Sequence, residues 1–71
     1  MNHDALHEEM TLEEALALLG YMAHHSEHHA QELLEASRAL PEKAAAHIAE
    51  AVVLLTQSNE KIRAAIKEAE G

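Results

Sequence analysis

Cysteine, tryptophan and phenylalanine are absent from this 71-residue chain, and tyrosine, proline and glycine are scarce. Without cysteine there can be no disulfide, no thiolate nucleophile and no cysteine-ligated zinc or iron–sulfur site. Tyr21 is the single aromatic residue, so the core must be built mainly from Ala and Leu side chains. A domain of this length buries a small share of its surface. We therefore expect self-association or a metal to stabilise it.

Basic residues are also few, because five Lys and Arg stand against 13 Asp and Glu, for a net charge of −8. This balance argues against nucleic acid as a partner, since phosphate binding needs clustered basic side chains. No apolar run reaches the roughly 18 residues of a membrane-spanning helix, and the N-terminus lacks the basic-then-apolar order of a signal peptide. We expect a cytoplasmic protein with no nucleic-acid or membrane partner.

Two amphipathic segments occupy most of the chain. The first, about residues 11–38, opens on Thr11-Leu12-Glu13-Glu14, a capping-box pattern that predicts a helix start. Pro41 ends this segment and suits the start of a second helix, about residues 42–69. Small and apolar residues recur every three or four positions in both segments and predict one buried seam. They are Leu12, Leu16, Leu19, Ala23, Ser26, Ala30, Leu33, Ser37 and Leu40 in the first, and Ala44, Ile48, Ala51, Val52, Leu55, Asn59, Ile62, Ile66 and Ala69 in the second.

The short connection between the segments predicts an all-α fold, an antiparallel two-helix hairpin. Residues 11–71 are expected to form this helical domain, and residues 1–10 a flexible or partly helical arm. A two-helix hairpin buries one seam and leaves both flanks partly covered. We expect a homodimer to complete it to a four-helix bundle. Gly20 lies inside the first helix and is expected to allow a close approach of the helices.

The strongest functional signal is a cluster of four histidines, His24, His25, His28 and His29. The pairs 24/28 and 25/29 have i,i+4 spacing, which places side chains one above the other on a helix. Two imidazoles so placed can chelate one metal ion. At about 100° per residue, His25 and His29 fall on a half-buried flank beside Leu18, whereas His24 and His28 face outward.

Carboxylates extend this candidate site. Glu32 follows His29 by three residues, and Glu50 follows His47 by three residues in the second helix. Antiparallel helices rotate in opposite senses, so both His-x-x-Glu units are expected on one side of the hairpin, with Glu32 level with Glu50. Such units resemble the ligands of carboxylate-bridged bundle sites in their chemistry, although the order of His and Glu is reversed.

The N-terminus offers a separate candidate metal site. If Met1 has a free amine, that amine, two backbone amides and the His3 imidazole form a square-planar set of ligands. Such a set suits Cu(II) or Ni(II). This pattern is only three residues long and is common by chance.

These residues favour a protein that binds a divalent transition metal (Zn, Ni, Co or Cu) for sequestration, sensing or delivery to a recipient protein. The alternatives are a protein-interaction module with a pH-sensitive histidine face and a haem carrier whose flank histidines are axial ligands in a dimeric bundle. The chain has no Ser-His-Asp order and no Gly-rich phosphate loop, so we do not expect an enzyme.

The stretch from Tyr21 to Leu33 reads Tyr-Met-x-x-His-x-x-His-His-Ala-x-Glu-Leu. It resembles a group of small histidine-rich helical proteins of bacteria and archaea that have no established activity. The resemblance continues through residues 48–52 and 59–67 and covers about residues 12–68. It implies an association with transition metals, with nickel, cobalt or zinc as the ion. The metal-binding residues that it implies are His25, His28, His29 and Glu32.

Overall fold

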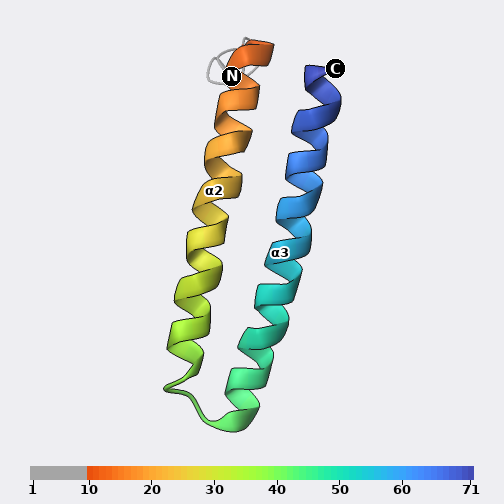
Figure 1. The fold of residues 1–71 in the computed structure, drawn as a ribbon. Coiled ribbons are helices and arrows are strands. Elements are labelled where there is room, and N and C mark those ends of the chain that lie inside the picture. The colour runs from red at the N-terminus through yellow and green to blue at the C-terminus, as the bar shows by residue number, and fades with distance from the viewer. Residues whose placement is uncertain (1–9) are drawn as a thin grey trace, which may run out of the picture.

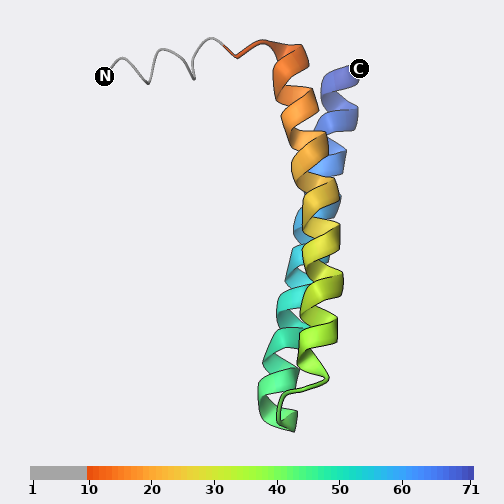
Figure 2. The ribbon, with the colours of Figure 1, turned by 90° about the vertical axis from the view of Figure 1, so that its left-hand side faces the viewer.

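The computed structural model describes residues 10–71, and residues 1–9 of the expected arm lie outside this range. Two α-helices make up the described fold, α2 at Leu12–Ser37 and α3 at Glu42–Glu70. They run antiparallel and side by side, so that the start of α2 and the end of α3 lie at the same end of the molecule (Figure 1). A view rotated by 90° shows that the hairpin is a single layer of two helices (Figure 2). The prediction of an all-α helical hairpin is confirmed.

The start of α2 follows from the sequence around Thr11. The backbone N–H of Glu14 donates to Thr11 Oγ1 at 3.1 Å, and the N–H of Thr11 donates to Glu14 Oε1 at 2.9 Å. This reciprocal pair is the predicted capping box, and it satisfies two backbone groups that a helix start otherwise leaves unpaired. Glu13 and Glu14 also place negative charge in the first turn, where the helix dipole favours it.

Contacts between residues close in sequence also form the turn between α2 and α3 and the end of α3. At the end of α2, the N–H groups of residues 38–40 donate to carbonyls three residues earlier, which tightens the chain. Pro41 then stands as the N-cap of α3, and its carbonyl accepts from the N–H of Ala45 at 2.8 Å. The helix ends where Gly71, at a φ of 97°, donates its N–H to the Lys67 carbonyl. Glycine adopts this left-handed conformation without steric cost.

The seam between the helices is thin. Ala23 is fully buried and Asn59 is 6% exposed. The other covered seam residues are only half-buried: Leu16, Leu19, Ser26, Ala30, Leu33 and Ser37 in α2, and Ala44, Ile48, Ala51, Val52, Leu55, Ile62 and Ile66 in α3. Leu12, Leu40 and Ala69 are exposed, which corrects the prediction that they lie in the seam. They stand near the ends of the hairpin, where the partner helix does not cover them.

Large apolar side chains remain at the surface of the hairpin. Leu54 is 65% exposed and Tyr21 62%. One helix can cover only the facing stripe of its partner, so apolar residues beside that stripe stay in contact with water. No helix within residues 10–71 is long and apolar enough to cross a membrane.

Gly20 lies in α2 with open space beside it. A Cβ atom built on Gly20 would meet no atom within 4 Å, so the predicted close approach of the helices at this residue is wrong. We expect Gly20→Ala to stabilise the fold by about 1 kcal/mol, because alanine loses less conformational freedom than glycine in a helix. The midpoint of thermal unfolding, followed by circular dichroism, should rise by roughly 4–8 °C. A lower midpoint would contradict this reading.

Candidate metal centre

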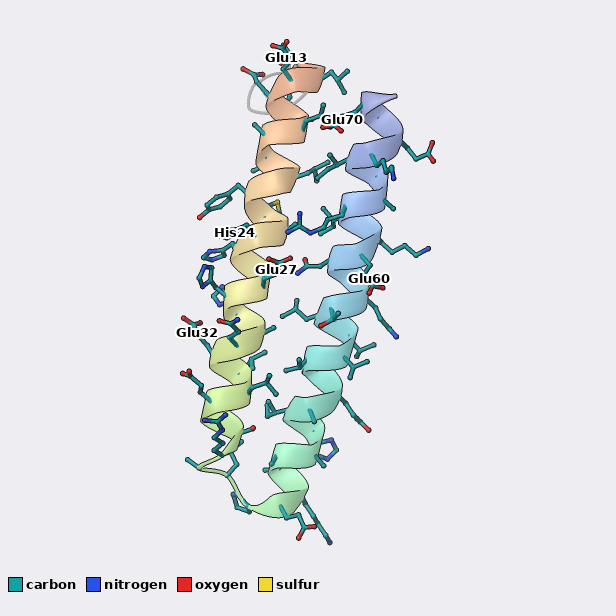
Figure 3. The ribbon with its side chains drawn as sticks, in the orientation of Figure 1. Glu13, His24, Glu27, Glu32, Glu60 and Glu70 are labelled. Atoms are coloured by element: carbon teal, nitrogen blue, oxygen red, sulfur yellow. The ribbon has the colours of Figure 1, made fainter. Side chains whose placement is uncertain are left out.

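The four histidines of α2 are exposed and form two pairs. The ring centroids of His25 and His29 lie 4.3 Å apart, and those of His24 and His28 lie 5.0 Å apart. Both pairs meet edge to face, at interplanar angles of 78° and 84°. His24 points away from α3 (Figure 3). The i,i+4 spacing therefore brings the two imidazoles of each pair together. Within residues 10–71, no ring of one pair contacts a ring of the other pair.

Glu32 makes the pair at His25 and His29 chemically distinct from the other pair. The Nδ1 atom of His29 lies 3.1 Å from Glu32 Oε1. An ionised carboxylate can only accept a hydrogen bond, so this contact places a proton on Nδ1. The Nε2 atom of a neutral His29 then keeps its lone pair. Histidine ligands of metals characteristically donate their second ring N–H to a carboxylate in this way.

Tyr21 completes the arrangement on the N-terminal side. Its ring stacks on that of His25, with centroids 5.5 Å apart and an interplanar angle of 15°. Tyr21, His25, His29 and Glu32 thus form a continuous file of contacts along α2, which we call the histidine column. The column orients His25 from one side and His29 from the other. The i,i+4 spacing of Tyr21 and His25 is the sequence signal that could have predicted this contact.

The flank that carries the histidine column is open to solvent. Leu18 is 43% exposed, Met22 47%, and the side chain of His29 54%. The prediction that His25 and His29 lie on a half-buried flank therefore gives them too much burial, because both histidines are exposed on a single hairpin. The physical reason is that α3 covers only the facing stripe of α2.

An ion pair between the helices fixes which flanks share a side. Arg63 Nη2 lies 2.7 Å from Glu27 Oε2, and Glu27 points toward α3 (Figure 3). Glu27 stands eight residues after Leu19 and Arg63 eight after Leu55, so both are offset by about 80° from mid-seam. Residues that have the same angular offset from mid-seam in α2 and in α3 therefore lie on the same side of the hairpin. Both side chains are about half exposed, so the pair contributes little stability.

The same relation places the remaining predicted ligands. His47 has the same offset from the α3 seam as His29 has from the α2 seam, which puts both on the side opposite the Glu27–Arg63 pair. His47 and Glu50 are exposed on α3, several residues along the axis from His29. Within residues 10–71, no three histidine or acidic side chains gather closely enough to hold a metal ion. His3 lies outside the described residues.

Asn59 is a feature that sequence reasoning treated only as a seam position. Its Oδ1 atom is buried and has no hydrogen-bond partner within the described residues. It borders an open hollow lined by Glu27, Ala30, Thr56, Glu60 and Arg63, on the side away from the histidine column. Asn59 is the single polar residue among the predicted seam positions of α3, and this is the sequence signal that could have marked it, because such residues fix helix register at a cost in stability.

A family model covers most of the chain. The model of a domain of unknown function, DUF8180, matches residues 15–69. The chain belongs to the DUF8180 family. No curated protein and no solved structure matches it.

The DUF8180 match spans the parts of the hairpin that carry the candidate site. It includes the whole histidine column, together with His47 and Glu50 on α3, and it begins after the capping box at Thr11. His3 also lies outside the matched residues. The function of the DUF8180 family is unknown. The transition-metal association that the sequence resemblance implies therefore stays a prediction.

Proposed function

We propose that this DUF8180 protein binds a divalent transition-metal ion at the histidine column, with His25 and His29 as ligands. The observation that carries the proposal is the contact between the two imidazoles, whose ring centroids lie 4.3 Å apart. Helix-borne imidazoles at i,i+4 are a known metal-chelating arrangement. The hydrogen bond to Glu32 supports His29 in this role, because it leaves Nε2 available for the ion.

The ligand chemistry selects a class of ions. Neutral imidazoles suit Zn(II), Ni(II), Co(II) and Cu(II), whereas Mg(II) and Ca(II) prefer oxygen ligands. The column is exposed, so an ion bound by one hairpin can exchange with solvent or with another protein. This accessibility suits a non-catalytic protein that sequesters, senses or hands on its ion.

The other candidate ligands have auxiliary roles in this proposal. His24 and His28 form a second pair on the outer face of α2, without a carboxylate contact at either ring within residues 10–71. His47 stands on α3, on the same side of the hairpin as the column. Glu50 lies at the outer edge of that side. A homodimer that completes a four-helix bundle would cover this side, since the hairpin leaves it exposed.

Titration of the untagged, metal-free chain with Zn(II), Ni(II), Co(II) and Cu(II) tests the proposal. Isothermal calorimetry should give a dissociation constant of about 1 μM or tighter for at least one of these ions, which corresponds to roughly −8 kcal/mol. Mg(II) is the control, and it should produce no saturable heat. If no transition-metal ion binds more tightly than about 1 mM, the proposed function is wrong.

A protein-interaction module is the second candidate, because apolar side chains stand exposed on both helices. Leu18 and Met22 on α2, and Leu54 on α3, are each more than 40% exposed. A cluster of such residues at a surface is typical of a contact with another protein. If this is the whole function, His25→Ala with His29→Ala should leave both partner binding and thermal stability unchanged, with or without metal.

A further inference from the structure

The histidine column lies at the middle of the hairpin. The helix α2 has 26 residues, Leu12–Ser37, and its midpoint falls between His24 and His25. Two hairpins that pack side by side over their full length must be related by a twofold axis that passes through this level or runs parallel to the helices. In either arrangement, the column of one copy lies at the same height as that of the other copy.

The side that carries the column also exposes apolar side chains from both helices. Its exposed apolar residues are Leu18 and Met22 on α2 and Leu54 on α3. A second copy packed on the column side would cover apolar surface that a single hairpin leaves in contact with water.

Leu54 lies beside the column although it belongs to the other helix. Glu27 reaches Arg63, and Ala30 and Thr56 line the same hollow between the helices. These two relations place Leu54 approximately level with the turn of α2 that carries His29. Since Leu54 precedes Leu55 by one residue, it is offset toward the column side of α3. Val53, one residue earlier, is offset toward the outer face instead.

One hairpin offers two imidazoles at the column, whereas a structural zinc ion takes four protein ligands. We propose that two copies of this chain share one ion, bound by His25 and His29 of each copy, at a twofold interface. This inference rests on the proposed metal-binding function and adds the partner that completes the site. Glu32 of each copy holds its His29, and the apolar side chains around the column exclude water from the ion.

The stoichiometry of Zn(II) binding tests this inference directly. Native mass spectrometry and sedimentation of the untagged chain should give two chains and one Zn(II) at saturation. A complex of one chain with one ion, or of two chains with two ions at the columns, overturns the shared site and leaves the metal-binding function standing. If Zn(II) does not bind, the shared Zn(II) site is wrong, whereas the metal-binding function fails only if Ni(II), Co(II) and Cu(II) do not bind either.

A pair of neighbouring substitutions gives an independent test that leaves every ligand in place. Leu54→Glu and Val53→Glu each add one negative charge at an exposed position, 65% and 54% exposed respectively. Leu54→Glu should shift the Zn(II)-loaded protein to monomer and weaken Zn(II) binding at least tenfold, because it puts a charge into the interface. Val53→Glu should change the affinity less than twofold.

Circular dichroism of both variants verifies that the helices form. Dimer mass and Zn(II) affinity that are unaltered by Leu54→Glu would overturn the interface. Equal losses from the two substitutions would overturn it as well, since a general charge effect would then account for both.

Discussion

The double substitution His25→Ala with His29→Ala is expected to weaken Zn(II) binding by at least about 100-fold. Loss of a residue that only supports a metal ligand costs about 10–100-fold in affinity, and this variant removes two ligands. The ring centroids of the two histidines lie 4.3 Å apart, and Glu32 supports this pair through its contact with His29. Calorimetric titration of the variant beside the unaltered chain measures the change.

The control is the double substitution His24→Ala with His28→Ala. It removes the same number of imidazoles, at the same i,i+4 spacing, from the same helix. Alanine is a better helix former than histidine, so neither variant should lose helix content, and lost binding cannot be ascribed to unfolding. The control should keep the affinity within about tenfold. If it loses as much affinity as the first variant, or more, the assignment of the column as the primary site is wrong.

The second large effect is expected from pH. A metal ligand must be a neutral imidazole, so protons compete with the ion, and histidine takes up its proton between about pH 5 and 8. Once the ligands titrate, each imidazole weakens binding up to tenfold per pH unit. Two imidazoles then give up to about 100-fold per unit. Zn(II) affinity should therefore stay high at pH 7.5 and fall steeply as the pH is lowered to 5.5.

A chromophoric Zn(II) indicator, added to the loaded protein during acid titration, follows this release. The steepness also counts the ligands, because four shared imidazoles give a slope about twice that of two. The His24→Ala with His28→Ala variant should release its ion over the same pH range. Affinity that is constant from pH 7.5 to 5.5 would show that imidazoles do not hold the ion.

Acid also changes the charge of the metal-free chain. If all seven histidines take up a proton, the net charge moves from −8 to −8 + 7 = −1. Repulsion between copies of the chain then falls while the metal affinity falls too. Oligomeric state and Zn(II) content should therefore be measured on the same samples, so that association caused by lost charge is distinguished from association through a shared ion.

Much of the fold followed from short-range features of the sequence. Thr11 and Glu14 are three residues apart, so the side chain of each can accept a hydrogen bond from the backbone N–H of the other when a helix starts at Thr11. The apolar period predicted which faces of the helices meet, and the short connection at Pro41 predicted their antiparallel pairing. The same periodicity predicted the two histidine pairs, because i,i+4 contacts depend only on helical geometry.

The environment of the site could not be predicted in this way. The angle alone predicted a half-buried flank, yet all four side chains of the histidine column are exposed, since burial depends on how much surface the partner helix covers. The sequence predicted that the helices approach closely at Gly20, but a Cβ atom built there would meet no atom within 4 Å.

What the sequence alone determined, then, is the hairpin and the pairing of His25 with His29 on one helix. Only the tertiary structure decided which side chains meet between the helices, such as the Glu27–Arg63 pair, and which seam positions near the ends stay exposed. Those contacts depend on the relative height and rotation of two helices, which the period of a sequence leaves free by a turn or more. The contacts of the histidine column form within α2 alone and therefore follow from the sequence. The exposure of the column depends on how α3 packs against α2, which only the tertiary structure shows.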